Sequence, residues 1–129
     1  MDESGKGIKI ITGGVTAAKG FKAASTAAGI KYKDRQDMAM IYSQEPCRSA
    51  GTFTTNVVKA APVKWDKNQV TNGVPARAVV INAGIANACT GEEGMGYCGQ
   101  TAGAAAQALG IPAESVLVAS TGVIAMQLP

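Results

Sequence analysis

The chain has 129 residues, with 12 Lys or Arg against 9 Asp or Glu and no histidine. Without an imidazole it cannot by itself build a Ser-His-Asp or Cys-His nucleophile pair, a His-ligated zinc site or a histidine proton shuttle. Its length predicts one domain, and because only 5% of the residues are aromatic we expect a core of small side chains.

The hydropathy, cysteine and charge patterns each exclude a class of protein or a location. No run of about 18 apolar residues is present, so no membrane span is expected, and the first residues lack the basic-then-apolar pattern of a signal sequence. Cys47, Cys89 and Cys98 form no CxxC pair, which predicts reduced, structural thiols and a cytoplasmic location. The basic residues are spread rather than clustered with aromatics, which indicates a solvated face and no nucleic-acid partner.

The first half of the chain predicts two strands and a helix. Residues 37–43 are short, apolar and bounded by charges, as in a strand. Pro46 is expected to break the ladder, and residues 49–56, rich in β-formers, predict a second strand that forms a hairpin with the first. Residues 57–70 predict a short helix with Pro62 at its boundary, followed by a turn at Asn72-Gly73.

The second half has the pattern strand, loop, helix, strand, loop, which is typical of an α/β fold. Residues 76–82 form a continuous apolar run, as in a strand covered on both faces. Thr90 and Glu93 predict a capping box at the start of a helix. Gly110 is expected to end that helix, whose apolar stripe comprises Ala102, Ala105, Ala106 and Leu109. Residues 115–120 predict another buried strand.

Two loops at strand ends carry the chemical interest. Residues 82–90 place two asparagines and a threonine before a helix N-terminus, where anions are favoured; alternatively, Asn82 and Asn87 only cap and turn the backbone. Thr121 and Gly122 offer a hydroxyl and an unhindered backbone N–H, the ingredients of an oxyanion hole. The same residues also suit an ordinary turn.

Four blocks of sequence together resemble the N-terminal half of the ornithine acetyltransferase family, also called glutamate N-acetyltransferase or ArgJ. They occur in the family's order over nearly the whole chain, although Ile85 departs from the family's Asn-rich loop. The blocks are residues 14–21, residues 53–56 with 59–63, residues 82–91 and residues 120–124.

The resemblance implies an α/β (α+β layered), N-terminal-nucleophile-type fold that a second chain completes. Family members cleave themselves before a threonine, which becomes the nucleophile at the head of a β chain. The family's Ala-Thr-Met-Leu-like cleavage motif is absent here. Residues 1–129 are therefore expected to be the α-chain portion of one larger catalytic domain.

The activity that the resemblance implies is transfer of an acetyl group from N-acetylornithine to glutamate in arginine biosynthesis. Thr121 and Gly122 match the motif that supplies the family's oxyanion hole. No cofactor or metal is expected, although some members use acetyl-CoA as a co-substrate, and the expected assembly is a heterotetramer of two α and two β chains. Two alternatives are a related acyltransferase or amidohydrolase of the same fold, and a non-catalytic α/β module that binds a small molecule.

Overall fold

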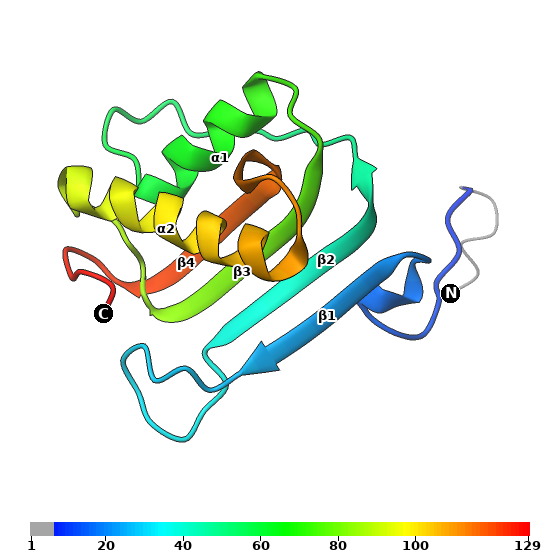
Figure 1. Cartoon of the computed structure of the whole chain (residues 1–129), viewed down its shortest axis with the longest axis horizontal. Helices are drawn as coiled ribbons and strands as arrows, with labels where there is room; N and C mark the ends of the chain where they lie inside the picture. The colour runs from blue at the N-terminus through cyan, green and yellow to red at the C-terminus, as the bar shows by residue number, and fades with distance from the viewer. Residues whose placement is uncertain (1–6) are drawn as a thin grey trace.

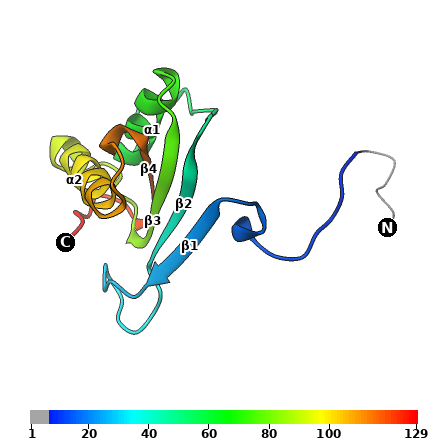
Figure 2. The same cartoon turned by 45° about the vertical axis from the view of Figure 1, so that its right-hand side comes forward.

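A computed structural model describes residues 7–129, which form a four-stranded sheet with two helices packed on one face (Figures 1 and 2). The elements in chain order are η2 (Val15–Ala17), β1 (Phe21–Thr26), β2 (Met38–Cys47), α1 (Ala61–Thr71), β3 (Ala76–Ile85), α2 (Gly91–Leu109), η3 (Ala113–Ser115) and β4 (Val116–Val123). The mixed α+β class expected from the sequence is confirmed.

The strands lie in the order β1-β2-β3-β4. The first three are antiparallel neighbours, whereas β4 runs parallel to β3. A parallel connection needs a long crossover, which α2 supplies by passing over one face of the sheet (Figure 1). As a result, β3 and β4 end side by side at the same edge of the sheet.

The core between the sheet and α2 is made of small side chains, as expected. The stripe on α2 packs against β3 and β4 and allows the helix to approach the sheet closely. Gly110 ends the helix in the left-handed conformation, with φ +67°, as the sequence predicts. The buried residues of this cluster are Ala78, Val80, Ala102, Ala105, Ala106 and Val116.

Helix α1 covers the outer edge of β4 with two consecutive side chains. The Trp65 indole N–H donates to the carbonyl oxygen of Val116 at 2.9 Å. The Val118 backbone N–H donates to a carboxylate oxygen of Asp66, also at 2.9 Å. The two side chains therefore take the hydrogen bonds that a further strand would take.

The predicted hairpin between residues 37–43 and 49–56 is wrong. The first strand exists as β2, but it continues through Pro46 at a register irregularity, and its two neighbours are β1 and β3. Residues 49–56 form no strand. Local bonds turn this segment instead: the Asn56 N–H donates to the Thr54 hydroxyl and the Val58 N–H to the Asn56 amide oxygen, a known competitor of sheet pairing.

Strand β3 is covered by helices on one face only, contrary to the expectation from its apolar run. Alternate side chains of β3, including Val79 and Ile81, point to the face opposite the helices, which no other element of residues 7–129 covers (Figure 2).

Within residues 7–129, no helix is long and apolar enough to cross a membrane.

Candidate functional site

The two polar segments singled out in the sequence meet where β3 and β4 end. Contrary to expectation, they are not wholly loops, because β3 extends to Ile85 and β4 to Val123. The parallel register pairs Asn82 with Ser120, Ala83 with Thr121 and Gly84 with Gly122. This places the predicted oxyanion-hole residues beside the last residues of β3. The sequence alone does not give this pairing, because it depends on the register of two strands joined by a 19-residue helix.

Gly84 and Gly122, which pair across β3 and β4, both lie in backbone conformations that favour glycine. Both have positive φ, +106° and +131°, which side-chain-bearing residues rarely adopt. A Cβ on Gly122 would overlap the backbone of Gly84 and Ile85. Glycine at position 122 is therefore required by the packing of backbone against backbone.

Thr121 and Gly122 are both exposed in the last residues of β4. A threonine hydroxyl next to a backbone N–H at a strand end can donate two hydrogen bonds to one acceptor atom. This is the donor set of an oxyanion hole. Both donors that the sequence suggested are therefore exposed, and their role as an oxyanion hole stays a prediction.

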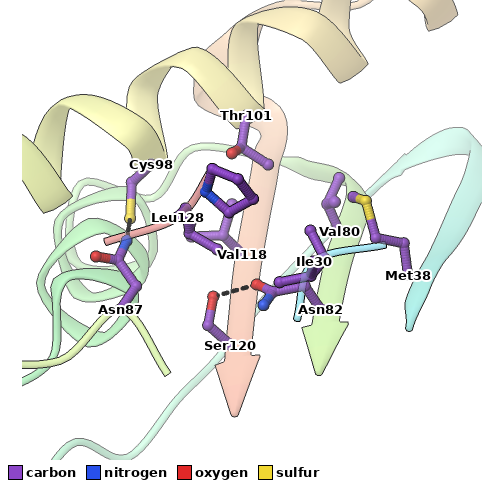
Figure 3. Close-up of a pocket in the computed structure, with 11 residues that line it drawn as sticks. Ile30, Met38, Val80, Asn82, Asn87, Cys98, Thr101, Val118, Ser120 and Leu128 are labelled. Atoms are coloured by element: carbon purple, nitrogen blue, oxygen red, sulfur yellow. Dashed lines mark hydrogen bonds between the residues drawn. The ribbon is translucent and has the colours of Figure 1, made fainter. Parts of the chain in front are cut away.

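A pocket with a mainly apolar lining lies between the sheet and α2, and Ser120, the residue before Thr121, contributes to it. Its volume is about 200 Å³. The Ser120 hydroxyl donates to the Asn82 amide oxygen at 2.6 Å (Figure 3). The Asn82 amide donates in turn to the Ile85 carbonyl at 2.9 Å. These bonds hold both strands at the level of the Gly84–Gly122 contact. The other lining residues are Ile30, Met38, Val80, Asn87, Cys98, Thr101, Val118, Leu128 and Pro129.

The other polar side chains of the 82–90 segment, those of Asn87 and Thr90, are buried and make hydrogen bonds within the protein. Asn87 is 1% exposed and donates to the Gly94 carbonyl at 3.0 Å and to the Cys98 sulfur at 3.4 Å. The Thr90 hydroxyl donates to the Asn87 amide oxygen at 2.6 Å. The predicted capping box is therefore wrong: Thr90 precedes α2, but its hydroxyl does not cap the helix. Of the two readings left open for Asn87, the structural one fits.

Two titratable groups lie near the pocket, between α1 and α2. Burial raises the pKa of the Asp66 carboxyl to about 6, against which the hydrogen bond from Val118 acts. Burial, and then the charge of Asp66, raise the pKa of the Cys98 thiol to about 11. A thiol with so high a pKa is a poor nucleophile at neutral pH. The structural role expected for Cys98 is thus supported by its burial. Cys89, for which the same role is expected, is exposed.

The described residues show no constellation for a metal. Among residues 7–129, no group of three or more Cys, Asp or Glu side chains gathers closely enough to hold an ion. The donors at the site are instead hydroxyls, amides and backbone N–H groups. They suit an anionic or carbonyl oxygen better than a cation.

Comparison with known proteins gives the site its context. Residues 22–129 match the model of the ArgJ family. The chain is 51% identical over 119 residues to an arginine biosynthesis bifunctional protein ArgJ of Gloeobacter violaceus, covering 92% of this chain and 29% of the relative. With the ArgJ protein of Thermotoga neapolitana it shares 52% identity over 112 residues, which is 86% of this chain and 28% of the relative.

Two crystal structures share the fold. ArgJ from Bacillus halodurans superposes with a TM-score of 0.85 and 39% identity, over 91% of this chain and 61% of that chain. Ornithine acetyltransferase from Mycobacterium tuberculosis, complexed with ornithine, gives a TM-score of 0.85 and 47% identity, over 90% and 63%. The chain spans about three tenths of the length of the curated relatives and matches their N-terminal region. It belongs to the ArgJ family.

Proposed function

We propose that this chain is the α-chain portion of a glutamate N-acetyltransferase, which moves the acetyl group of N-acetylornithine to glutamate, and that Thr121 and Gly122 form its oxyanion hole. The observation that carries the proposal is the exposed pair of donors at the end of β4, held there by the Gly84–Gly122 contact. Membership of a family whose members are named for arginine biosynthesis supports the choice of reaction.

The reaction divides into two acyl transfers. The hydroxyl oxygen of a threonine at the head of the β chain attacks the acetyl carbonyl carbon of N-acetylornithine. The C–N bond then breaks, ornithine leaves as the amine with the proton given up by the threonine, and an acetyl ester remains. The amine of glutamate attacks this ester, which returns the hydroxyl and releases N-acetylglutamate. Acetyl-CoA is a second donor for the same ester.

The chemistry suits a chain without histidine. An N-terminal threonine is activated by its own α-amine or a nearby one, so no imidazole is needed. In both steps the carbonyl oxygen becomes negatively charged in a tetrahedral intermediate. The Thr121 hydroxyl and the Gly122 N–H stabilise that charge, a contribution of about 2.7–4 kcal/mol per donor in comparable enzymes.

The proposal includes a β chain packed on this one, in an assembly of two α and two β chains. The uncovered face of the sheet supports a partner there. Several of the side chains on this face are apolar, although they lie where a single chain would present polar ones. They include Ile41, Val79, Ile81 and Leu117, which are only half-buried.

The test is to purify the product of the complete reading frame, sequence its N-termini and assay acetyl transfer from N-acetylornithine to glutamate. We expect a second chain beginning with Thr. Thr121→Ala should lower kcat by about 10²–10³. Thr71→Ala, which removes an exposed hydroxyl at the end of α1, is the matched control and should leave kcat unchanged.

Two results would overturn the proposal. One is the absence of both a threonine-headed chain and acetyl transfer in the wild-type protein. The other is an unchanged kcat for Thr121→Ala in an enzyme that does transfer acetyl groups. Profiling other N-acyl amino acids as donors in the same assay separates this reaction from that of a related acyltransferase or amidohydrolase.

A further inference from the structure

The loop between β1 and β2 gathers positive charge next to the strand ends that carry Thr121 and Gly122. Lys31 and Arg35 both lie over the ring of Tyr32, with the Lys31 ammonium 4.3 Å and the Arg35 guanidinium 4.9 Å from its centroid. Lys31 also donates to the Tyr32 hydroxyl at 2.8 Å. One exposed aromatic ring thus holds two cations together.

The loop is fixed to the sheet through Asp37. This buried carboxylate accepts the backbone N–H of Ala28 at 2.6 Å and that of Ile30 at 2.7 Å. The hydrogen bond from Ala28, with that from Ile30, holds the pKa of Asp37 below its usual value, so the carboxylate is charged at neutral pH. The cations are therefore carried on an anchored loop, which reduces the entropy lost when they bind a ligand.

Lys31 lies against the strand ends themselves. A Cβ on Gly84 would come within 3.1 Å of the Lys31 Cβ, so the lack of a side chain at Gly84 allows the loop to pack there. Gly84 in turn touches Gly122. The β1–β2 loop therefore contacts the end of β3, which in turn contacts the end of β4. Figure 1 shows this loop at the end of the sheet where β3 also ends.

We propose that Lys31 and Arg35 bind the α-carboxylate of the N-acyl amino acid whose acetyl group Thr121 and Gly122 polarise. In such a molecule the carboxylate is separated from the acetyl carbonyl only by the amide nitrogen and the α-carbon. A carboxylate site must therefore lie close to the oxyanion hole, as this loop does. The inference rests on the proposed function, and it assigns the loop a role in substrate selection.

The carboxylate fits this loop better than the phosphates of acetyl-CoA do. Both ligands are anions, and both would be attracted by Lys31 and Arg35. The phosphates of acetyl-CoA, however, are separated from the acetyl group by the whole pantetheine arm, whereas the loop packs directly against Gly84. The test below includes acetyl-CoA as a separate donor for this reason.

The test compares N-acetylornithine with N-acetylputrescine, the same molecule without its carboxylate, using the full enzyme. For the double variant Lys31→Met with Arg35→Met, we expect the KM and the calorimetric Kd for N-acetylornithine to rise about tenfold or more, the loss expected for a charged hydrogen bond. The kcat, the Kd for N-acetylputrescine and the KM for acetyl-CoA should stay within about twofold. The pair Lys31→Arg with Arg35→Lys should restore binding, since it keeps both charges.

Lys33→Met is the matched control, because Lys33 lies exposed in the same loop and its replacement also removes one positive charge. It should leave every constant unchanged. Equal losses on both ligands, a loss confined to acetyl-CoA, or unchanged N-acetylornithine binding would each overturn the inference. If the wild-type enzyme binds N-acetylornithine without transferring its acetyl group, the proposed function fails, and the binding comparison still decides the inference. If it does not bind N-acetylornithine at all, both fail.

Discussion

The loop after β3 and the end of β4 have similar polar, glycine-containing sequences but opposite environments. In residues 82–90 the side chains of Asn87 and Thr90 are buried and bonded to one another and to α2. At the end of β4, Thr121 and Gly122 are exposed. The comparison teaches that burial, rather than residue type, separates the polar groups that build the site from those available to a substrate.

The largest expected effect is that of Gly122→Ala, which breaks the contact between the two regions. The new Cβ would overlap the Gly84 backbone at a φ that alanine rarely adopts. Backbone strain and overpacking together should lower the free energy of unfolding by about 4 kcal/mol, measured by urea denaturation of the full-length protein. Acetyl transfer should be lost as well.

Gly103→Ala is the control for this substitution. Gly103 lies within α2, and a Cβ there meets no other atom within 4 Å. Alanine should therefore stabilise the protein by about 0.5–1 kcal/mol, as expected in a helix interior. Similar effects of the two substitutions would contradict the close packing of Gly84 and Gly122.

Asn87→Ala tests the buried half of the comparison. It leaves the Gly94 carbonyl and the Thr90 hydroxyl without their partner, and it places alanine at φ +50°. We expect a loss of about 3 kcal/mol in the free energy of unfolding, measured by urea denaturation. Thr121→Ala should change the same quantity by less than about 0.5 kcal/mol. Equal losses would mean that the two regions do not differ as described.

The smallest effect is expected for Asp66→Asn, and it depends on pH. The folded-state pKa of about 6 lies above the ordinary value of 3.8. The folded protein therefore binds the proton more tightly, and stability falls as the pH rises through this window. Asparagine removes that penalty and still accepts from Val118, so at pH 7 we expect a gain of about 1 kcal/mol, a figure reduced for the solvent that reaches this carboxyl.

Thermal unfolding of the Asp66→Asn variant and the wild type at pH 4 and pH 7 measures this effect. The two proteins should differ little at pH 4, where the carboxyl of the wild type is largely protonated. Asp66→Ala should destabilise the protein at both pH values, because the Val118 N–H then loses its acceptor. A destabilised Asp66→Asn protein at pH 7 would show that the negative charge itself is needed.

Local patterns in the sequence predicted the second half of the fold well. Short-range patterns are enough to predict the apolar runs of β3 and β4 and the alanine stripe of α2. The helix end at Gly110 follows from the backbone conformation that glycine allows. In the first half, β1 was missed, since Phe21–Thr26 is mostly small residues without clear alternation. Residues 49–56 have β-forming side chains, but local bonds and the occupied neighbours of β2 prevent pairing.

The site was predicted only in part. Thr121 and Gly122 could be chosen as candidates from their chemistry and from the resemblance to the family. Their role remains a prediction. The Asn82–Ser120 bond could not be foreseen, because it requires the register of β3 and β4. In the sequence Lys31 is one of several scattered basic residues, and only the folded chain shows its contacts with Gly84 and with the Tyr32 ring.

The pair Trp65 and Asp66 has a consequence for how this protein meets other chains. Strand β4 lies at the border of the sheet, where unpaired N–H and C=O groups invite another strand to add on and start an aggregate. The indole and the carboxylate occupy the Val116 and Val118 groups that such a strand would use. At this part of β4, association with another chain by β-sheet extension is therefore blocked by side chains of the same chain.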